Sequence, residues 1–159
     1  MRAYQARLPT PFAVLGIVTD GAALTAVDFL PMGTPVLEPQ NPLAEKVCAQ
    51  LQAYLSAPSF RFDLPLAPRG TAFQARVWQA LGEIPCGSTL RYGELARLLH
   101  SAPRAVGQAC GANPIAVIVP CHRVLARGGL GGFMNSSGGE ALAIKRWLLE
   151  HESGQSKAA

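Results

Sequence analysis

The sequence predicts an α/β protein in which a small N-terminal domain of antiparallel strands and one helix packs on a mainly helical C-terminal domain. Residues 3–30 hold three short apolar runs separated by turn residues, a pattern typical of antiparallel strands. From residue 70 onward, apolar residues recur mostly at helical spacing. The proline-spaced stretch Leu64–Gly70 lies between these regions, so we place the domains at residues 1–66 and 67–159.

The N-terminal domain is expected to contain strands and one helix. The predicted strands are Ala3–Leu8, Phe12–Thr19 and Ala22–Leu30. Asp20-Gly21 is a dipeptide typical of hairpin turns. Asn41 as N-cap and Pro42 at the first helical position predict the start of the helix. Beyond it, Phe60-Arg61-Phe62 alternates like a further short strand.

The C-terminal domain is expected to contain four helices, one buried strand and one long loop. Thr71 is a candidate cap for the first helix, and Ser88 or Thr89 for a second that ends near His100. The remaining predicted elements are a helix of small residues at Arg104–Ala112, a strand at Ile115–Val119, a glycine-rich loop at Gly128–Gly139, a helix at Leu142–Glu152 and a frayed tail at Ser153–Ala159.

Composition excludes several classes of protein. Of 159 residues, 49% are hydrophobic and 15% charged, enough for a buried core. No apolar run is long enough to span a membrane, and the N-terminus lacks the apolar segment of a signal peptide, so we expect a cytoplasmic location. The four cysteines form no CxxC pair, so we expect neither a metal site nor disulfides.

Positive charge is concentrated in the second half of the chain. Net charge is −1 over residues 1–66 and +5 over residues 67–159, which suits a phosphate backbone. Two neighbouring helices joined by a tight turn indicate a helix-turn-helix there. The second helix carries small residues such as Ala105 and Gly107, which fit either a narrow minor groove or close packing inside the protein.

A cysteine and a histidine directly follow the predicted buried strand, in the tetrapeptide Pro120-Cys121-His122-Arg123. A cysteine nucleophile must lose its proton, and histidine is the usual group that accepts it. A buried, unreactive cysteine is the alternative interpretation, because cysteine is among the most buried residue types.

The stretch IAVIVPCHRV, from Ile115, resembles the active-site signature of the O6-alkylguanine-DNA alkyltransferases (methylated-DNA–protein-cysteine methyltransferases). Similar motifs are GTAFQARVWQAL, IPCGSTLRYGELA, PRAVGQACGANP and AIKRWLLEHE, so the resemblance covers most of residues 70–152. It implies a helix-turn-helix of winged-helix type and a DNA-repair reaction without a cofactor. In that reaction an alkyl group moves irreversibly from O6 of guanine, and from O4 of thymine, to Cys121, once per molecule.

The resemblance also implies roles for individual residues. Cys121 matches the alkyl acceptor, and His122 the histidine that deprotonates it through a water. Glu152 matches the carboxylate that orients this histidine. Asn113 matches the asparagine that ties the recognition helix to the active-site segment. Tyr92 matches the tyrosine that rotates the target nucleotide and donates to the guanine.

The implied partner is double-stranded DNA containing O6-alkylguanine, bound through the minor groove by a monomer that can cluster along DNA. Arg104 matches the arginine that enters the duplex in place of the extruded base, a step needed because a stacked base cannot reach a pocket. We assign Ala105, Gly107 and Arg123 to the same interface. Arg91 joins them as a phosphate contact, although the family commonly has serine there.

The glycine-rich loop is expected to line the alkyl pocket. We assign Gly131, Gly132 and Phe133 from the loop, with Val119, to this pocket. The loop is longer than the family's commonest form and has Phe133 where many members have tyrosine. The N-terminal zinc ligands of some members are missing from this sequence.

Three other functions predict different observations. Non-catalytic DNA-binding relatives lack the acceptor cysteine, which is present here as Cys121. A cysteine hydrolase would turn over an acyl substrate, whereas an alkyltransferase acts once. A sequence-specific regulator would need longer side chains than the small-residue helix provides.

Overall fold

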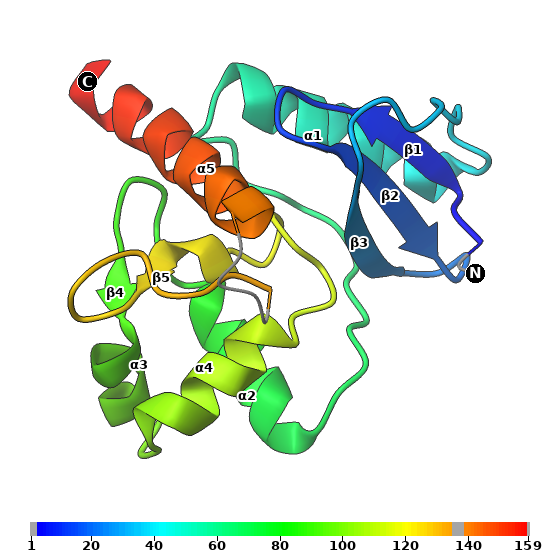
Figure 1. Ribbon diagram of the computed structural model, residues 1–159. Helices are drawn as coiled ribbons and strands as arrows, with labels where there is room; N and C mark the ends of the chain where they lie inside the picture. Colours follow the sequence, from blue (N-terminus) through cyan, green and yellow to red (C-terminus); the bar gives the residue numbers. More distant parts are fainter. Residues whose placement is uncertain (1–2, 135–138, 159) are drawn as a thin grey trace. The chain divides into compact units, whose positions relative to one another are not determined.

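The computed structural model describes residues 3–134 and 139–158, and for residues 155–158 the backbone alone (Figure 1). The chain folds into two units. The first comprises Met1–Arg69 and Pro114–Ala116, and the second comprises Gly70–Asn113 and Val117–Ala159. Among the described residues there is no helix that could cross a bilayer.

A three-stranded antiparallel sheet with strand order β1-β2-β3 forms the centre of the first unit. Its strands are β1 (Ala6–Pro9), β2 (Val14–Thr19) and β3 (Leu24–Leu30), so the three predicted strands are confirmed, with later starts. Gly16 of β2 lies under the ring of Tyr4, where a Cβ atom would come within 2.4 Å of a ring carbon. Glycine is therefore needed there to let the aromatic ring cover the sheet.

The helix α1 (Pro42–Ser56) packs against all three strands. Its predicted start is confirmed, because the Asn41 side chain accepts a hydrogen bond from the N–H of Ala44. The predicted strand Phe60–Phe62 is absent. The backbone at Asp63 instead forms two hydrogen bonds with the side-chain amide of Gln50 on α1, so this segment pairs with a side chain and not with a strand.

Helices make up most of the second unit. They are α2 (Ala72–Leu81), α3 (Tyr92–Leu98), α4 (Pro103–Gly111) and α5 (Gly139–Ala158). Thr71 and Gln74 form a complete capping box at the start of α2, as Thr71 predicted. The buried indole of Trp78 on α2 donates to the carbonyl of Ala109 on α4 at 2.8 Å, which fixes α4 against α2.

A two-stranded parallel ladder, which the sequence did not predict, precedes α3. It pairs β4 (Leu90–Arg91) with β5 (Val124–Leu125). The predicted helix start at Ser88 or Thr89 is therefore wrong, because residues 90 and 91 are extended and paired. Glu94 accepts a hydrogen bond from the N–H of Arg91 and so marks the true start of α3.

The apolar run before the cysteine is not a strand. Ile115 forms an isolated bridge with Val27 of β3, and residues 116–118 form turns. Val117 has a φ of 72°, a left-handed conformation that is rare for a β-branched residue and reverses the chain. The whole run is buried, as predicted, but burial without a strand partner gives no regular ladder.

At the C-terminus, the helix is longer than predicted. α5 begins at Gly139 and continues to Ala158, so the expected frayed tail is helical as far as Ala158. Residues 135–138 of the predicted glycine-rich loop lie outside the described residues.

Candidate active site

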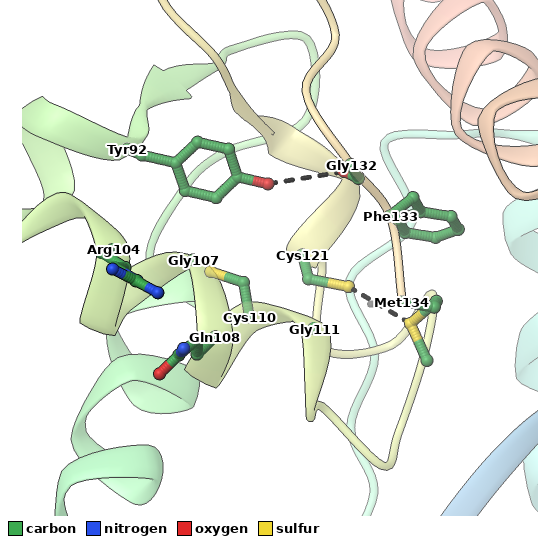
Figure 2. Close-up of a pocket in the computed structure, with 10 residues that line it drawn as sticks. All are labelled: Tyr92, Arg104, Gly107, Gln108, Cys110, Gly111, Cys121, Gly132, Phe133 and Met134. Atoms are coloured by element: carbon green, nitrogen blue, oxygen red, sulfur yellow. Dashed lines mark hydrogen bonds between the residues drawn. The ribbon is translucent and has the colours of Figure 1, made fainter. Parts of the chain in front are cut away.

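The sulfur of Cys121 lies at a cavity of about 430 Å³ in the second unit (Figure 2). Cys121 is the first residue of a 3-10 turn, Cys121–Arg123, and only 3% of its surface is exposed. Its N–H donates to the carbonyl of Val119 at 2.8 Å, which holds the cysteine at the tight bend after the buried run. The cavity is lined by Tyr92, Arg104, Gly107, Gln108, Cys110, Gly111, Cys121, Gly132, Phe133 and Met134.

The side-chain amide of Asn113 connects the end of α4 to the cysteine. Its Nδ2 donates to the carbonyl of Val119 at 2.8 Å and to the sulfur of Cys121 at 3.3 Å. Asn113 is 2% exposed, so both bonds lie in a low-dielectric environment where a lost donor is costly.

Burial raises the pKa of the Cys121 thiol to about 11, although the Asn113 hydrogen bond and the charge of Lys145 act in the opposite direction. At neutral pH the sulfur is therefore protonated. A reaction at this sulfur needs a neighbouring base.

A histidine–carboxylate pair lies directly beside this thiol in the sequence. His122 Nε2 lies 2.7 Å from Oε2 of Glu152 on α5, and both side chains are almost completely buried. With Nε2 donating to the carboxylate, the neutral ring has its lone pair on Nδ1. Within the described part of the chain, this Nδ1 is the one buried side-chain nitrogen or oxygen without a hydrogen-bond partner. Burial lowers the pKa of His122 and favours the neutral ring.

Arg123, which the sequence analysis assigned to DNA contact, is hydrogen-bonded within the protein. Its Nε donates to Glu152 Oε1 at 2.8 Å, its Nη2 to Oε2 at 3.1 Å and its Nη1 to the carbonyl of Ile84 at 2.6 Å. The side chain is 12% exposed, and all three of its nitrogens donate to groups within the protein.

A buried lysine, which the sequence analysis missed, holds the loop beside the cavity. Lys145 of α5 is fully buried, and its Nζ donates to the carbonyls of Val124, Leu130 and Gly132 at 2.8, 2.5 and 2.9 Å. Burial lowers its pKa to about 8. The only signal in the sequence was the position of Lys145 on the face of the last helix that carries apolar residues. Lysine is normally found on the exposed face of a helix.

Tyr92, the first residue of α3, closes another side of the cavity (Figure 2). Its hydroxyl donates to the carbonyl of Gly132 at 3.4 Å, and Lys145 Nζ lies 5.8 Å from its ring centroid. Burial raises the pKa of Tyr92 to about 12, so the phenol keeps its proton. Tyr92 and Lys145 thus converge on one loop carbonyl.

Only part of the predicted alkyl pocket lines the cavity. Gly132 and Phe133 do, whereas Gly131 and Val119 do not. The carbonyl of Val119 accepts hydrogen bonds from Asn113 and from the N–H of Cys121. Gly131 contributes a backbone conformation that favours glycine. Gly131 has a φ of 73°, and a Cβ atom there would come within 3.1 Å of the ring of Tyr92.

Some cavity residues were not predicted. They are Gln108, Cys110, Gly111 and Met134. The thioether of Met134 lies 3.9 Å from the sulfur of Cys121, so it forms part of the wall beside this sulfur.

Of the residues assigned to DNA contact, Arg104 and Gly107 of α4 line the cavity, whereas Ala105 and Arg91 do not. Arg104 is exposed and lines the cavity, as does Gly107 one turn further along α4. Ala105 is half-buried, and Arg91 is exposed just before α3. The thin face of α4 is therefore open beside the cavity.

Known proteins provide an independent comparison. The family model described as "6-O-methylguanine DNA methyltransferase, DNA binding domain" matches residues 72–154. A methylated-DNA–protein-cysteine methyltransferase of Haemophilus influenzae is 39% identical over 158 residues, covering 94% of this chain and 86% of the relative. One of Methanosarcina mazei is 51% identical over 115 residues, covering 70% of each protein.

Solved structures agree in fold. The crystal structure of the O6-methylguanine methyltransferase of Mycobacterium tuberculosis has a TM-score of 0.82 and 36% identity, covering 96% of this chain and 94% of the other. A structure from the same organism, of OGT in complex with DNA, has a TM-score of 0.78 and 38% identity, covering 94% and 92%.

Together the fold and the site define a protein with a cysteine nucleophile, placed at a cavity beside an open helix and next to a histidine–carboxylate pair. The chain belongs to the 6-O-methylguanine DNA methyltransferase family.

Proposed function

We propose that this protein repairs DNA by moving an alkyl group from O6 of guanine, and from O4 of thymine, to its own Cys121. The observation that carries the proposal is the sulfur at the cavity, with the Asn113 amide as donor and a histidine–carboxylate pair next in the chain. Membership of the family supports it, because the curated relatives are named for this transfer.

The proposed reaction begins with proton removal. A water between Cys121 and the unpartnered Nδ1 of His122 passes the thiol proton to the imidazole, whose Nε2 proton is held by Glu152. The resulting thiolate receives the hydrogen bond of Asn113, which stabilises negative charge on sulfur.

The thiolate then displaces guanine in one step. A bond forms between sulfur and the alkyl carbon while the bond from that carbon to O6 breaks, and its electron pair goes to the purine. The Tyr92 phenol, which keeps its proton, donates a hydrogen bond to the departing base. The thioether product has no good leaving group, so each molecule acts once.

We infer that DNA binds along α4, as the second helix of a winged helix-turn-helix formed with α3. Small residues such as Ala105 and Gly107 let this helix approach the minor groove. Arg104 fills the place of the extruded nucleotide, and Arg91 contacts a phosphate. The DNA complex of the Mycobacterium tuberculosis relative supports DNA as the partner.

One chain contains every residue that this step uses, which supports a monomer as the acting unit, with clustering along DNA as a further expectation. We assign binding and transfer to the domain of residues 67–159. A supporting role is assigned to residues 1–66.

Intact-mass spectrometry after incubation with duplex DNA containing O6-methylguanine tests the proposal. We expect one methyl group per molecule, on the peptide that contains Cys121, and no turnover. Cys121→Ala should take up none while still binding DNA, and Cys48→Ala, which removes a buried thiol of the first unit, should behave as wild type. Methyl uptake by Cys121→Ala, or repeated turnover, would refute the assignment.

A further inference from the structure

The carboxylate of Glu152 is shared between a histidine and an arginine. Oε2 receives both His122 Nε2 and Arg123 Nη2, and Oε1 receives Arg123 Nε. The two donors are consecutive residues of the 3-10 turn, whereas the acceptor, Glu152, lies on α5. The third donor nitrogen of Arg123 is fixed by the carbonyl of Ile84, so the arginine cannot leave the carboxylate without breaking a further bond.

The charges of this cluster balance only if the histidine is neutral. Glu152 is ionised because a permanently charged guanidinium is bonded to both its oxygens. The pair of Arg123 and Glu152 therefore has zero net charge. A proton on His122 would add an uncompensated positive charge to a site that is almost free of solvent, which is unfavourable.

Without the arginine, the balance would reverse. A buried carboxylate hydrogen-bonded to an imidazole favours the imidazolium, since an opposite charge at hydrogen-bond distance stabilises the protonated ring. A histidine that already holds its second proton cannot take one from a thiol.

We propose that Arg123 is a positioning residue of the reaction: its fixed charge balances that of Glu152, so that His122 stays neutral and free to accept the Cys121 proton. The inference rests on the proposed alkyl transfer, and it replaces the expected DNA contact of Arg123. Proton transfer from Cys121 to His122 then leaves the net charge of these four residues, Cys121 included, unchanged, because the thiolate and the imidazolium form together.

Other ionisable groups around His122 do not replace this effect. Arg76, the titratable residue of α2, donates to the carbonyl of Leu99 and so is engaged elsewhere. Lys145 acts on His122 in the same direction as Arg123, but its Nζ is bonded to three carbonyls and not to Glu152. Among the described residues, Glu152 and Lys145 from α5 and Arg123 from the 3-10 turn act electrostatically on His122, and Cys86, from the turn after α2, is affected by the charge of Glu152.

Two substitutions separate charge from geometry. Arg123→Gln removes the charge and keeps an amide donor, whereas Arg123→Lys keeps the charge and loses the two-pronged geometry. For Arg123→Gln, we expect the acid limb of the pH profile of single-turnover methyl transfer to move up by about one pH unit. Transfer on the acid side should slow about tenfold, with near-wild-type rates in alkaline solution. Arg123→Lys should keep the wild-type pH profile with a uniformly lower rate.

Arg146→Gln is the matched control, because Arg146 is an exposed arginine on α5. Its loss should leave the profile unchanged. An equal loss of rate at every pH in Arg123→Gln would show a purely structural role and overturn the proposal.

NMR titration of isotope-labelled histidine in the DNA-free protein gives a readout independent of alkyl transfer. His122 is assigned by comparison with His100→Gln and His151→Gln variants. We expect a neutral ring protonated on Nε2 at neutral pH in the wild type, and a higher pKa of His122 in Arg123→Gln. A charged His122 in the wild type would refute the inference even if Arg123→Gln failed to fold. If the wild type accepted no alkyl group, the proposed function would fail, while the titration would still decide the role of Arg123.

Discussion

The amide nitrogen of Asn113 donates to the sulfur of Cys121 at 3.3 Å while also holding the carbonyl of Val119 at 2.8 Å. One side chain thus fixes the bend that presents the cysteine and stabilises negative charge on its sulfur. Because Asn113 lies just beyond the end of α4, the position of the nucleophile is coupled to the helix proposed to bind DNA.

Replacing this asparagine should affect stability and rate together. In Asn113→Ala, the buried carbonyl of Val119 keeps the N–H of Cys121 but loses the amide donor, which should cost about 0.5–1.5 kcal/mol of unfolding free energy. Methyl transfer should also slow, and in Asn113→Asp it should slow further, because a carboxylate raises the pKa of an adjacent thiol. Urea unfolding and single-turnover kinetics measure the two effects.

Asn41→Ala provides the matched control, because Asn41 caps α1 in the first unit. It should lower stability by about 1 kcal/mol without changing the rate of transfer. Equal rates in all the asparagine variants would show that the hydrogen bond to sulfur has no role in the reaction.

The reactivity of Cys121 should follow its raised pKa. Since burial raises the pKa to about 11 from an ordinary value of 9.0, alkylation by iodoacetamide in the absence of DNA should keep accelerating between these pH values. An exposed thiol would level off there. Peptide mass spectrometry, with Cys121→Ala as the blank, follows the labelling. A rate that is constant above neutral pH would mean that the resting sulfur is already a thiolate.

Arg104 should matter only when the guanine is part of a duplex. Arg104→Ala should weaken methyl transfer from duplex DNA, because nothing then occupies the place of the extruded base. Transfer from the free base O6-methylguanine should be little changed. Equal losses with both substrates would argue against base extrusion, and Arg146→Ala controls for the loss of one positive charge.

Lys145 should produce a distinctive pH dependence of stability. Its pKa is about 8 in the folded protein and 10.5 ordinarily, so between these values the unfolded chain binds more protons. The unfolding free energy of the wild type should therefore rise with pH in this window, relative to Lys145→Met. Urea unfolding at the two ends of the window measures the difference, in which groups common to both proteins cancel. A wild-type advantage that falls with pH would contradict the expected burial cost.

Gly131→Ala should be harmful where Gly128→Ala is not. At Gly131 the φ of 73° disfavours a side chain, and a Cβ would contact Tyr92 and Ala126 at 3.1 Å, whereas nothing lies within 4 Å of such an atom at Gly128. We expect a loss of about 1 kcal/mol or more and slower transfer only in Gly131→Ala. Thermal unfolding and single-turnover kinetics compare the pair. Similar behaviour of the two variants would mean that the loop adjusts freely.

Local signals in the sequence predicted much of the fold. Asn41 and Thr71 have side chains that accept hydrogen bonds from the first turns of the helices they cap, so the starts of α1 and α2 could be located correctly. The short pairing of β4 with β5 could not, because it joins segments far apart in the sequence that have no alternating pattern. Ile115–Val119 was misread for a related reason, since an apolar run indicates burial but not backbone conformation.

The candidate site shows the same division. A motif of adjacent residues pointed to Cys121 and His122. The partner of Arg123 could not be found in the same way, because Glu152 lies far along the chain, and Arg123 was therefore assigned to DNA. Lys145 was missed because its role depends on three backbone carbonyls, which no sequence pattern reveals. Tertiary hydrogen bonds, between side chains and to the main chain, were thus the information that the sequence lacked.

The three-residue excursion Pro114–Ala116 makes the second unit discontinuous. Val27 of β3 donates to the carbonyl of Pro114 at 2.9 Å, and Ile115, which forms the bridge to Val27, is fully buried. A gene fragment starting at Gly70 would therefore encode this excursion without the strand that receives it. Shortening or swapping the N-terminal region would expose an apolar patch only a few positions before the nucleophile, so the two halves of the gene cannot be exchanged as independent modules.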